Sequence, residues 1–401
     1  MSATLFANVE MAPRDPILGL TEAFNADSRA TKVNLGVGVY QDASGKLPLL
    51  GAVKAAEKAR VESAPARGYQ PIEGATAYNQ AVQKLLFGEA SPIISEGRCI
   101  TFEALGGTGA LKIGADYLRR LLPQAKLYIS DPSWENHRAV FETAGFTVDT
   151  YAYYDADTKG VAFDKTKAAL NALAENSIVL LHACCHNPTG ADLSVEQWKE
   201  VVAICKSKGL VPFLDMAYQG FADSIDEDAA AVKLFAESGL PFLIASSFSK
   251  SFSLYGERVG SLTIVTTSKD ESARVLSQVK RVVRTNYSNP PTHGGALVAA
   301  ILSSPELRRQ WEDELAEMRN RIRAMRTGLV EKLKAAGVQR DYAFVIKQRG
   351  MFSYTGLSSA QVDRLREEFG IYAVGTGRIC LAALNEQNLD YVAQAIAAVE
   401  K

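Results

Sequence analysis

Lys250 is the residue whose type and position most directly suggest chemistry. It follows an apolar run in the segment IASSFSKSFSLYGERVG, where Ser247 and Ser249 precede it and Arg258 comes eight residues later. A lysine at the end of a strand is usually only a solvated charge. A nucleophilic lysine needs its pKa lowered by burial or by a neighbouring cation, and Arg258 is such a cation. The segment therefore fits a lysine that attacks a carbonyl group.

A glycine-rich turn in LGGTGALKIGADYL is the second candidate. Gly107, Thr108 and Gly109 can offer backbone amides and a hydroxyl to a phosphate at the start of a helix. A turn without a ligand is one alternative. A dinucleotide site with Asp131 on the ribose is another, but Lys112 stands where the third glycine of that motif belongs.

Asp215 and Tyr218, in FLDMAYQGF, follow a strand that should be buried on both faces. A buried carboxylate needs a cationic partner, because without one its burial costs several kcal/mol. A protonated pyridine nitrogen is a suitable partner. The alternative is an aspartate that caps the next helix.

Two further segments, HACCHNPTG and SDPSWENH, place Asn187 and Trp134 just after strands. Asn187 precedes a proline in a sharp turn, and an exposed tryptophan ring is costly unless it covers something. A plain turn and core packing are the alternatives. His137 and His182 are interpreted as orienting or packing residues, and no spacing of histidines and cysteines indicates a metal site.

Together these five segments supply a phosphate cup, an amine nucleophile, an acid for a ring nitrogen, a donor for a phenolic oxygen and a stacking ring. Pyridoxal phosphate requires all of these groups. The sequence therefore predicts a site for this cofactor.

The elements that must position these residues are strands alternating with helices. Five apolar runs are predicted to be strands: 99–105, 126–130, 177–183, 210–214 and 241–246. Such alternation predicts a mostly parallel sheet with helices on both faces, and ligands lie beyond the carboxyl ends of its strands. Ser194 and Gln197 have the spacing of a capping box and mark the start of one helix.

A smaller α+β unit is predicted after residue 304. A long helical pattern runs from Ser304-Pro305 to Gly337, and strands at 351–355 and 378–382 and helices at 358–368 and 386–399 follow it. The predicted division is an N-terminal arm at 1–14, part of the small domain at 15–45, a large cofactor-binding domain at 46–310, and a connecting helix with the small domain at 311–401.

Composition excludes several classes of protein. The chain has 401 residues, of which 47% are hydrophobic and 22% charged, and this composition is that of a globular enzyme. Its net charge of -1 argues against nucleic acid and anionic membranes as partners. Five cysteines, two of them adjacent, indicate a reducing compartment. With neither a signal peptide nor a run of about 18 apolar residues, we expect a cytoplasmic protein.

The motifs resemble those of the class I, fold-type I pyridoxal-phosphate aminotransferases, in the aspartate and aromatic-amino-acid group. The resemblance extends over essentially the whole chain, from DPILGL and VNLGVGVY through SDPSWENH, CCHNPTGADLS, DMAYQGF, SFSKSFSLYGERVG and NYSNPPTHG to TGRICLAAL. It implies an α/β fold, in which a large domain with a mostly parallel, helix-flanked sheet is joined to a smaller α+β domain.

The resemblance also implies a role for each site residue. Lys250 forms the internal aldimine and later carries a proton between Cα and the cofactor. The residues implied at the cofactor are Gly107, Thr108, Ser247, Ser249 and Arg258 around the phosphate, Trp134 on the ring, Asp215 at the pyridinium, and Asn187 and Tyr218 at the ring oxygen. The substrate would contact Arg378 at its α-carboxylate, together with Gly38, Trp134 and Asn187. A homodimer is implied as well, in which Tyr69 reaches the neighbour's phosphate and Arg284 the distal carboxylate of its substrate.

The substrate preference follows from finer similarity. LGGTGALKIGADYL, SFSLYGERVGSL and RGMFSYTGLSSAQVDRLREEFG look closer to the aromatic-amino-acid subgroup. We therefore expect ping-pong transamination of phenylalanine, tyrosine and also aspartate with 2-oxoglutarate. The alternatives are a strict aspartate aminotransferase and, more remotely, an NAD-dependent dehydrogenase or a non-catalytic ligand-sensing protein.

Overall fold

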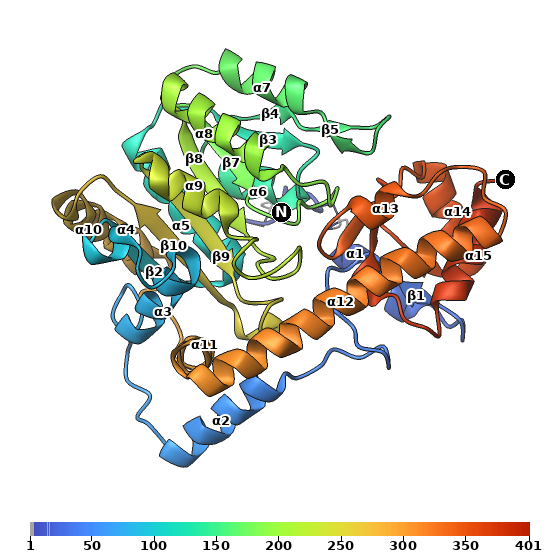
Figure 1. Ribbon diagram of the computed structural model, residues 1–401, viewed down its shortest axis with the longest axis horizontal. Helices are drawn as coiled ribbons and strands as arrows, with labels where there is room; N and C mark the ends of the chain where they lie inside the picture. Colours follow the sequence, from blue (N-terminus) through green and yellow to red (C-terminus); the bar gives the residue numbers. More distant parts are fainter. Residues whose placement is uncertain (1–3, 14, 16) are drawn as a thin grey trace.

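A seven-stranded sheet positions most of the predicted site residues, which lie at the ends of its strands or in the segments that follow them. The structure is a computed structural model that describes residues 4–13, 15 and 17–401. The strands lie in the order β2-β10-β9-β8-β7-β3-β4 (Figure 1). Their bounds are Cys99–Leu105 for β2, Val259–Val265 for β10, Phe242–Ser247 for β9, Val211–Met216 for β8, Ile178–His182 for β7, Leu127–Asp131 for β3 and Val148–Ala152 for β4.

All five strands predicted for this sheet are confirmed, and two of its strands, β4 and β10, were not predicted. β4 pairs with β3 in parallel, whereas β10 runs antiparallel to both of its neighbours, β2 and β9. Only a short segment without a crossover helix joins β9 to β10, and a parallel return would need a longer connection. The prediction of a mostly parallel sheet is confirmed, with β10 as its one antiparallel strand.

Helices cover both faces of this sheet, as predicted. On one face lie α5 (Gly106–Leu121), α6 (Glu135–Thr143) and α10 (Lys269–Asn286). On the other lie α3 (Thr76–Phe87), α7 (Phe163–Ala172), α8 (Val195–Lys208) and α9 (Ala230–Ser238). Every residue of β7 is buried in consequence.

The predicted start of α8 at a capping box is confirmed. The Gln197 amide donates to Ser194 Oγ at 3.2 Å, and the Ser194 amide donates to Gln197 Oε1 at 2.8 Å. Two amides at the start of the helix are thus satisfied without tertiary contacts.

The long predicted helix is α12 (Pro305–Ala335), which links the two parts of the molecule (Figure 1). The Ser304 hydroxyl accepts the amide of Leu307 at 3.3 Å and caps its first turn. One end of α12 packs on α2 (Gly51–Ser63) and α11 (His293–Ser303), and the other on α13 (Phe344–Lys347) and α15 (Leu389–Val399).

The smaller part combines segments from both ends of the chain. β1 (Val33–Asn34) pairs in parallel with β12 (Ile371–Tyr372), and β11 (Phe352–Tyr354) pairs antiparallel with β13 (Arg378–Cys380). α1 (Leu18–Ala26), α14 (Ser359–Phe369) and the 3₁₀ turn Leu381–Ala383 also belong to this part. The remaining short elements lie in the larger part: α4 (Pro92–Ser95), β5 (Tyr154–Asp155), β6 (Gly160–Val161) and the 3₁₀ turn Tyr255–Glu257.

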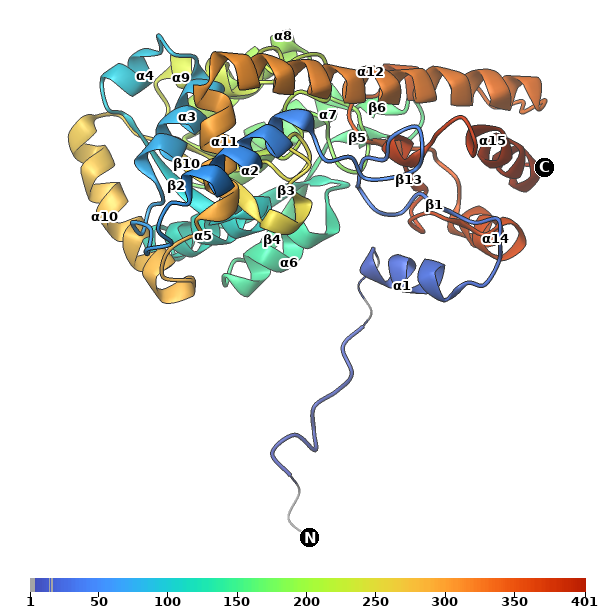
Figure 2. The ribbon, with the colours of Figure 1, turned by 90° about the horizontal axis from the view of Figure 1, so that it is seen from below.

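The domain division stays a prediction. Its boundary between residues 310 and 311 falls inside α12. Of the predicted arm, residues 1–3 and 14 lie outside the described part, and residues 4–13 extend away from the body of the molecule (Figure 2).

Two predicted elements of the smaller part have different bounds. The strand predicted at 378–382 ends at Cys380, because a 3₁₀ turn follows and the amide of Leu384 bonds to the carbonyl of Leu381. The helix predicted at 386–399 begins only at Leu389, because the Asn385 side chain accepts the amides of Gln387 and Asn388 and holds them in a turn.

Within the described residues, none of the helices combines the length and apolar character needed to cross a membrane.

Candidate active site

A cavity of about 800 Å³ lies beyond the carboxyl ends of the parallel strands and collects most of the predicted site residues. Those that line it are Gly38, Gly107, Thr108, Trp134, Asn187, Asp215, Tyr218, Ser247, Ser249, Lys250, Arg258 and Arg378. They come from segments far apart in the sequence, and both parts of the molecule contribute.

One corner of the cavity suits an anion. Gly107 and Thr108 lie in the first turn of α5, where backbone amides are free of intrahelical partners. Gly106, at the same turn, has φ +69°, and a Cβ there would lie 2.6 Å from Arg258 Nη2. Arg258 Nη1 lies 3.4 Å from the hydroxyl oxygen of Ser249. Amides, hydroxyls and a guanidinium therefore converge where a phosphate could bind, and we call this corner, formed by Gly107, Thr108, Ser249 and Arg258, the anion cup.

Lys250 follows β9 and points into the same cavity. Its side chain is half-buried, and Nζ lies 4.9 Å from the centre of the Tyr218 ring. Burial lowers the pKa of Lys250 to about 8; the charge of Asp215 opposes this shift and that of Arg258 reinforces it. A lysine with this pKa has a substantial neutral fraction near neutral pH, as a nucleophile requires.

Asp215, near the end of β8, is the buried acid of the cavity. Its side chain is buried, and Oδ2 accepts a hydrogen bond of 2.8 Å from His137 Nε2. Burial by itself would raise the pKa of this carboxyl, but the hydrogen bond from His137 and the charge of Lys250 hold it below its ordinary value. Asp215 is therefore a carboxylate that can pair with a cationic ring nitrogen.

A chain of hydrogen bonds behind Asp215 fixes which ring nitrogen of its partner, His137, carries a proton. The Asn187 amide donates to His182 Nδ1 at 3.2 Å, so the neutral His182 ring carries its proton on Nε2 and donates it to Ser133 Oγ. Ser133 then has its own proton to give to His137 Nδ1, 2.9 Å away, which leaves Nε2–H of His137 for Asp215. Burial lowers the pKa of His182 to about 3, and this supports the neutral ring.

Arg378, on β13, forms the opposite wall. Nη1 donates to Asn187 Oδ1 at 3.0 Å and Nη2 to the Gly36 carbonyl at 2.6 Å, while the ring of Phe352 lies 4.3 Å from Cζ. Nε is buried without a partner. A Cβ at Gly38 would lie 2.5 Å from the Phe352 ring, so this position requires glycine. The guanidinium is thus held in a position suited to a carboxylate.

Arg326 supports this wall from α12. Its buried guanidinium donates to the carbonyls of Val345, Gly350 and Phe352 at 2.8, 2.7 and 2.6 Å. The bonds join α12 to the segment that carries Phe352.

We expect Arg326→Met to lower the free energy of unfolding by about 3 to 5 kcal/mol, because three buried carbonyls lose their donors. Urea unfolding of both proteins measures this. Arg308→Met is the control on the same helix: Arg308 is partly exposed and pairs with Glu312 at 2.9 Å, so its loss should cost less than about 1 kcal/mol. Equal losses in the two variants would contradict the bracing role of Arg326.

Among the residues of the site that were not assigned from sequence, three make contacts that shape it. Ser133 links two histidines, Phe352 packs on Arg378, and the hydroxyl of Tyr255 accepts the Tyr40 amide at 3.1 Å while lining the cavity. His137 was predicted to be an orienting or packing residue, but no residue was named as its hydrogen-bond partner. Its place one helical turn after Trp134 could have pointed to the cavity.

Tyr69 and Arg284 lie outside the cavity. The Tyr69 side chain is 95% exposed, and Arg284 is exposed on α10, where it donates to the hydroxyl of Ser288. Neither reaches the site of its own chain. Their roles therefore stay predictions that require a second subunit.

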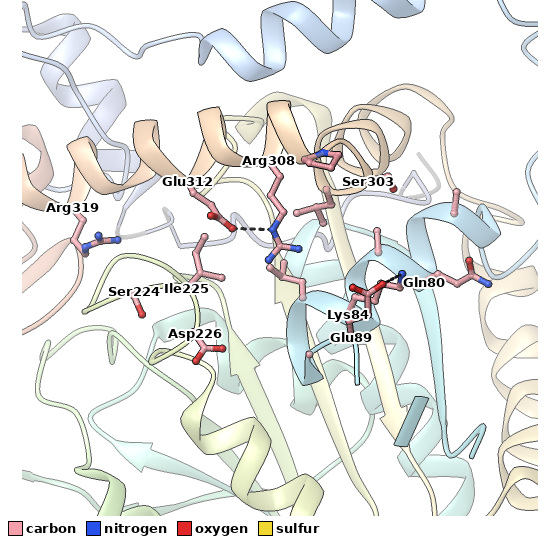
Figure 3. Close-up of a pocket in the computed structure, with 16 residues that line it drawn as sticks. Gln80, Lys84, Glu89, Ser224, Ile225, Asp226, Ser303, Arg308, Glu312 and Arg319 are labelled. Carbon is pink, nitrogen blue, oxygen red and sulfur yellow. Dashed lines mark hydrogen bonds and ion pairs between the residues drawn. The ribbon is translucent and has the colours of Figure 1, made fainter. Parts of the chain in front are cut away.

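A second cavity, of about 850 Å³, lies between α3, the start of α12 and the loop before α9 (Figure 3). None of the predicted site residues lines it. Two of its cations already have acidic partners: Lys84 lies 2.7 Å from Glu89, and Arg308 lies 2.9 Å from Glu312. The cavity therefore lacks the grouped catalytic residues of the first.

Cys184, Cys185 and Asp228 form a buried group of metal-ligand type that spacing alone did not indicate. The Asp228 carboxylate already accepts the amides of Gly220, Ala222 and Asp223 at 2.8 to 2.9 Å. Burial raises the pKa of the Cys185 thiol, which disfavours the thiolate that a metal would need. The geometry thus assigns Asp228 to holding its loop.

The cavity brings together a lysine of lowered pKa, an anion cup and a buried carboxylate, and these are the groups that a pyridoxal-phosphate enzyme requires. The chain belongs to the class I and II aminotransferase family, whose sequence model matches residues 30–396. It is therefore an aminotransferase.

Several relatives match over almost the full length. An aspartate aminotransferase of Pseudomonas aeruginosa is 65% identical over 99% of this chain and 100% of its own. An aromatic-amino-acid aminotransferase of Escherichia coli is 50% identical over 98% of this chain and 100% of its own. The crystal structure of an aromatic-amino-acid aminotransferase from Burkholderia pseudomallei, covalently bound to pyridoxal phosphate, has a TM-score of 0.97 and 69% identity, over 99% of this chain and 100% of that one.

These comparisons confirm the predicted family, fold class and cofactor, pyridoxal phosphate. The residues of the cavity fit this cofactor, because the anion cup, Lys250 and Asp215 supply the three kinds of contact that it needs. The alternatives of a dehydrogenase and of a non-catalytic sensor are excluded by the family.

Proposed function

We propose that this aminotransferase exchanges the amino group of phenylalanine, tyrosine or aspartate with 2-oxoglutarate in two half-reactions. The observation that carries this proposal is the buried Arg378, which faces the cavity of Lys250 and Asp215 and whose Nε has no hydrogen-bond partner. The names of the relatives divide between aspartate and aromatic amino acids, and this division supports a site that accepts both.

The cofactor would be held by contacts at both of its ends. Gly107, Thr108 and Arg258 would bind the phosphate, and Asp215 would keep the ring nitrogen protonated. Trp134 would cover one face of the ring. When bound, pyridoxal phosphate supplies a carbonyl carbon for amine exchange and a ring that accepts electrons from the substrate Cα.

Lys250 would have two tasks in this site. Its amine would hold the cofactor covalently at rest. Once substrate replaces it, the same amine would take the proton from the substrate Cα and deliver it to the cofactor carbon that carried the carbonyl group. A pKa of about 8 suits both directions, because a proton carrier works best when its pKa lies near the working pH.

Arg378 would orient the substrate by its α-carboxylate. Asn187 and Gly36 fix two of its nitrogens, so the guanidinium needs little reorganisation when a carboxylate arrives. Every amino acid has this carboxylate, and Arg378 would therefore act on all substrates alike.

Arg284 of a partner subunit would distinguish the substrates by their side chains. A guanidinium in a dry pocket suits a distal carboxylate but would be an unpaired buried charge beside a phenyl ring. Arg284 must then turn toward solvent when an aromatic side chain enters. It is exposed and held by a single serine hydroxyl in one chain, which leaves it free to do so.

A homodimer and a cytoplasmic location are part of this proposal. Leu5, Phe6, Val9 and Met11 are 72 to 96% exposed in the extended segment 4–13, and a second subunit would cover such apolar side chains. The five cysteines are free and buried, as suits a reducing compartment.

We expect Arg284→Ala to lower kcat/KM for aspartate by about 100-fold or more and to change that for phenylalanine little, because only aspartate loses a charged partner. Arg378→Lys should lower both alike. Arg281→Ala, one turn away on the exposed face of α10, is the control for a general charge effect. Steady-state kinetics with both substrates decide the question, and equal losses in Arg284→Ala would refute its selective role.

A further inference from the structure

Glu103 lies where three segments with predicted site residues meet. It belongs to β2, three residues before the turn that begins at Gly106. Its amide donates to the Glu73 carbonyl at 2.9 Å, and its own carbonyl accepts the Tyr287 hydroxyl at 3.0 Å. One residue thus contacts the loop that leads from Tyr69 and the end of the helix that carries Arg284.

The carboxyl group of Glu103 is enclosed by backbone. The side chain is 2% exposed, and Oε2 has no hydrogen-bond partner. A Cβ at Gly74 would lie 2.5 Å from Glu103 Cβ, and a Cβ at Gly295 would collide with Oε1. Two glycines on different segments therefore pack directly against this acid.

No described neighbour supplies a free positive charge. The titratable groups that face Glu103 are Tyr78 from α3, Tyr287 after α10, and Glu73 from the loop, which is paired with Lys280 at 2.8 Å. Ser261, opposite Glu103 on β10, has a hydroxyl without a partner. An ionised Glu103 would therefore be a buried and uncompensated charge.

We propose that Glu103 is a positioning residue whose protonation state sets how Tyr69 and Arg284 are presented to the partner subunit, and hence the preference for dicarboxylic over aromatic substrates. The specificity part rests on the proposed function. The neutral acid fits between Gly74 and Gly295. The ionised acid must gain water, and water can enter only if the glycine segments move apart.

This change falls near neutral pH. Burial raises the pKa of Glu103 to about 7, partly offset by the Ala75 amide. The pKa is raised in the folded state, so the proton stabilises the fold. That stabilisation is complete below about pH 4.5 and is lost as the pH rises through 7.

Thermal unfolding of the holoenzyme tests the ionisation directly. Glu103→Gln keeps the neutral shape, so the Tm of the wild type should fall relative to that of the variant by a few degrees between pH 5 and pH 8.5. Ser261→Ala, at the neighbouring site, removes no titrating group and should give a difference that does not vary with pH. A constant difference for Glu103→Gln as well would overturn the proposal.

The ratio of kcat/KM for aspartate to that for phenylalanine tests the link to specificity. This ratio cancels the titration of Lys250, which acts on both substrates. In the wild type the ratio should fall several-fold as the pH rises past 7, because the KM for aspartate increases. In Glu103→Gln the ratio should not change with pH. Identical profiles in the two proteins would overturn the role of Glu103, whereas a wild type inactive on both substrates would overturn the proposed function itself.

Discussion

Lys250→Ala should abolish turnover, with a loss in kcat of at least about 10,000-fold. Proton transfer by a positioned side chain alone contributes about 100- to 10,000-fold, and this variant also loses the amine that would hold the cofactor. The fold and the anion cup should survive, because the side chain is only half-buried and makes no structural hydrogen bond that would be lost. The variant should therefore still bind cofactor reversibly.

Two measurements check this assignment. Sodium borohydride should fix the cofactor irreversibly on the wild-type chain, and peptide mapping should locate the modified residue at Lys250. Lys208→Ala, at a partly exposed lysine in the last turn of α8, is the control and should keep full activity. A modified peptide that contains a different lysine would show that the assignment is wrong.

Asp215→Asn should lower kcat by about 100- to 1,000-fold. The loss of one charge-assisted bond in a desolvated site corresponds to about 2 to 4 kcal/mol at the transition state. The amide keeps the shape of the side chain, and its oxygen can still accept from His137. The loss in kcat would therefore result from the missing negative charge opposite the ring nitrogen and not from a change in packing.

His137→Asn provides the comparison for Asp215. It removes the hydrogen bond of 2.8 Å but keeps the carboxylate, so a smaller loss than in Asp215→Asn is expected. Single-turnover rates with one amino acid separate this effect from product release. Near-normal rates in Asp215→Asn would rule out the proposed role of the carboxylate.

Much of the candidate site could be predicted because its polar residues lie at or just after the ends of apolar strands. Asp215 lies near the end of β8 and Lys250 follows β9, and parallel strands bring their carboxyl ends to one edge of a sheet. Arg378 was assigned only through the resemblance to a family, since its short strand carries no comparable local signal. The catalytic roles themselves stay predictions.

The position of β10 shows why the rest could not be predicted. Its residues Val259–Val265 pair with two strands that come from quite different parts of the chain. Such pairing depends on how the whole sheet assembles, and a local pattern of apolar residues does not predict which strands will pair.

The sequence by itself determined the local elements and the kinds of side chain available for chemistry. The capping box at Ser194 and the alternation of strands and helices depend on residues close together in the chain, so the local sequence is sufficient to predict them. Only the tertiary structure decided that His137 meets Asp215, that Arg378 binds Asn187 across 191 positions, and that Glu103 is buried without a counter-charge. These contacts form between distant segments, and packing of the complete core determines which polar groups meet and which remain alone.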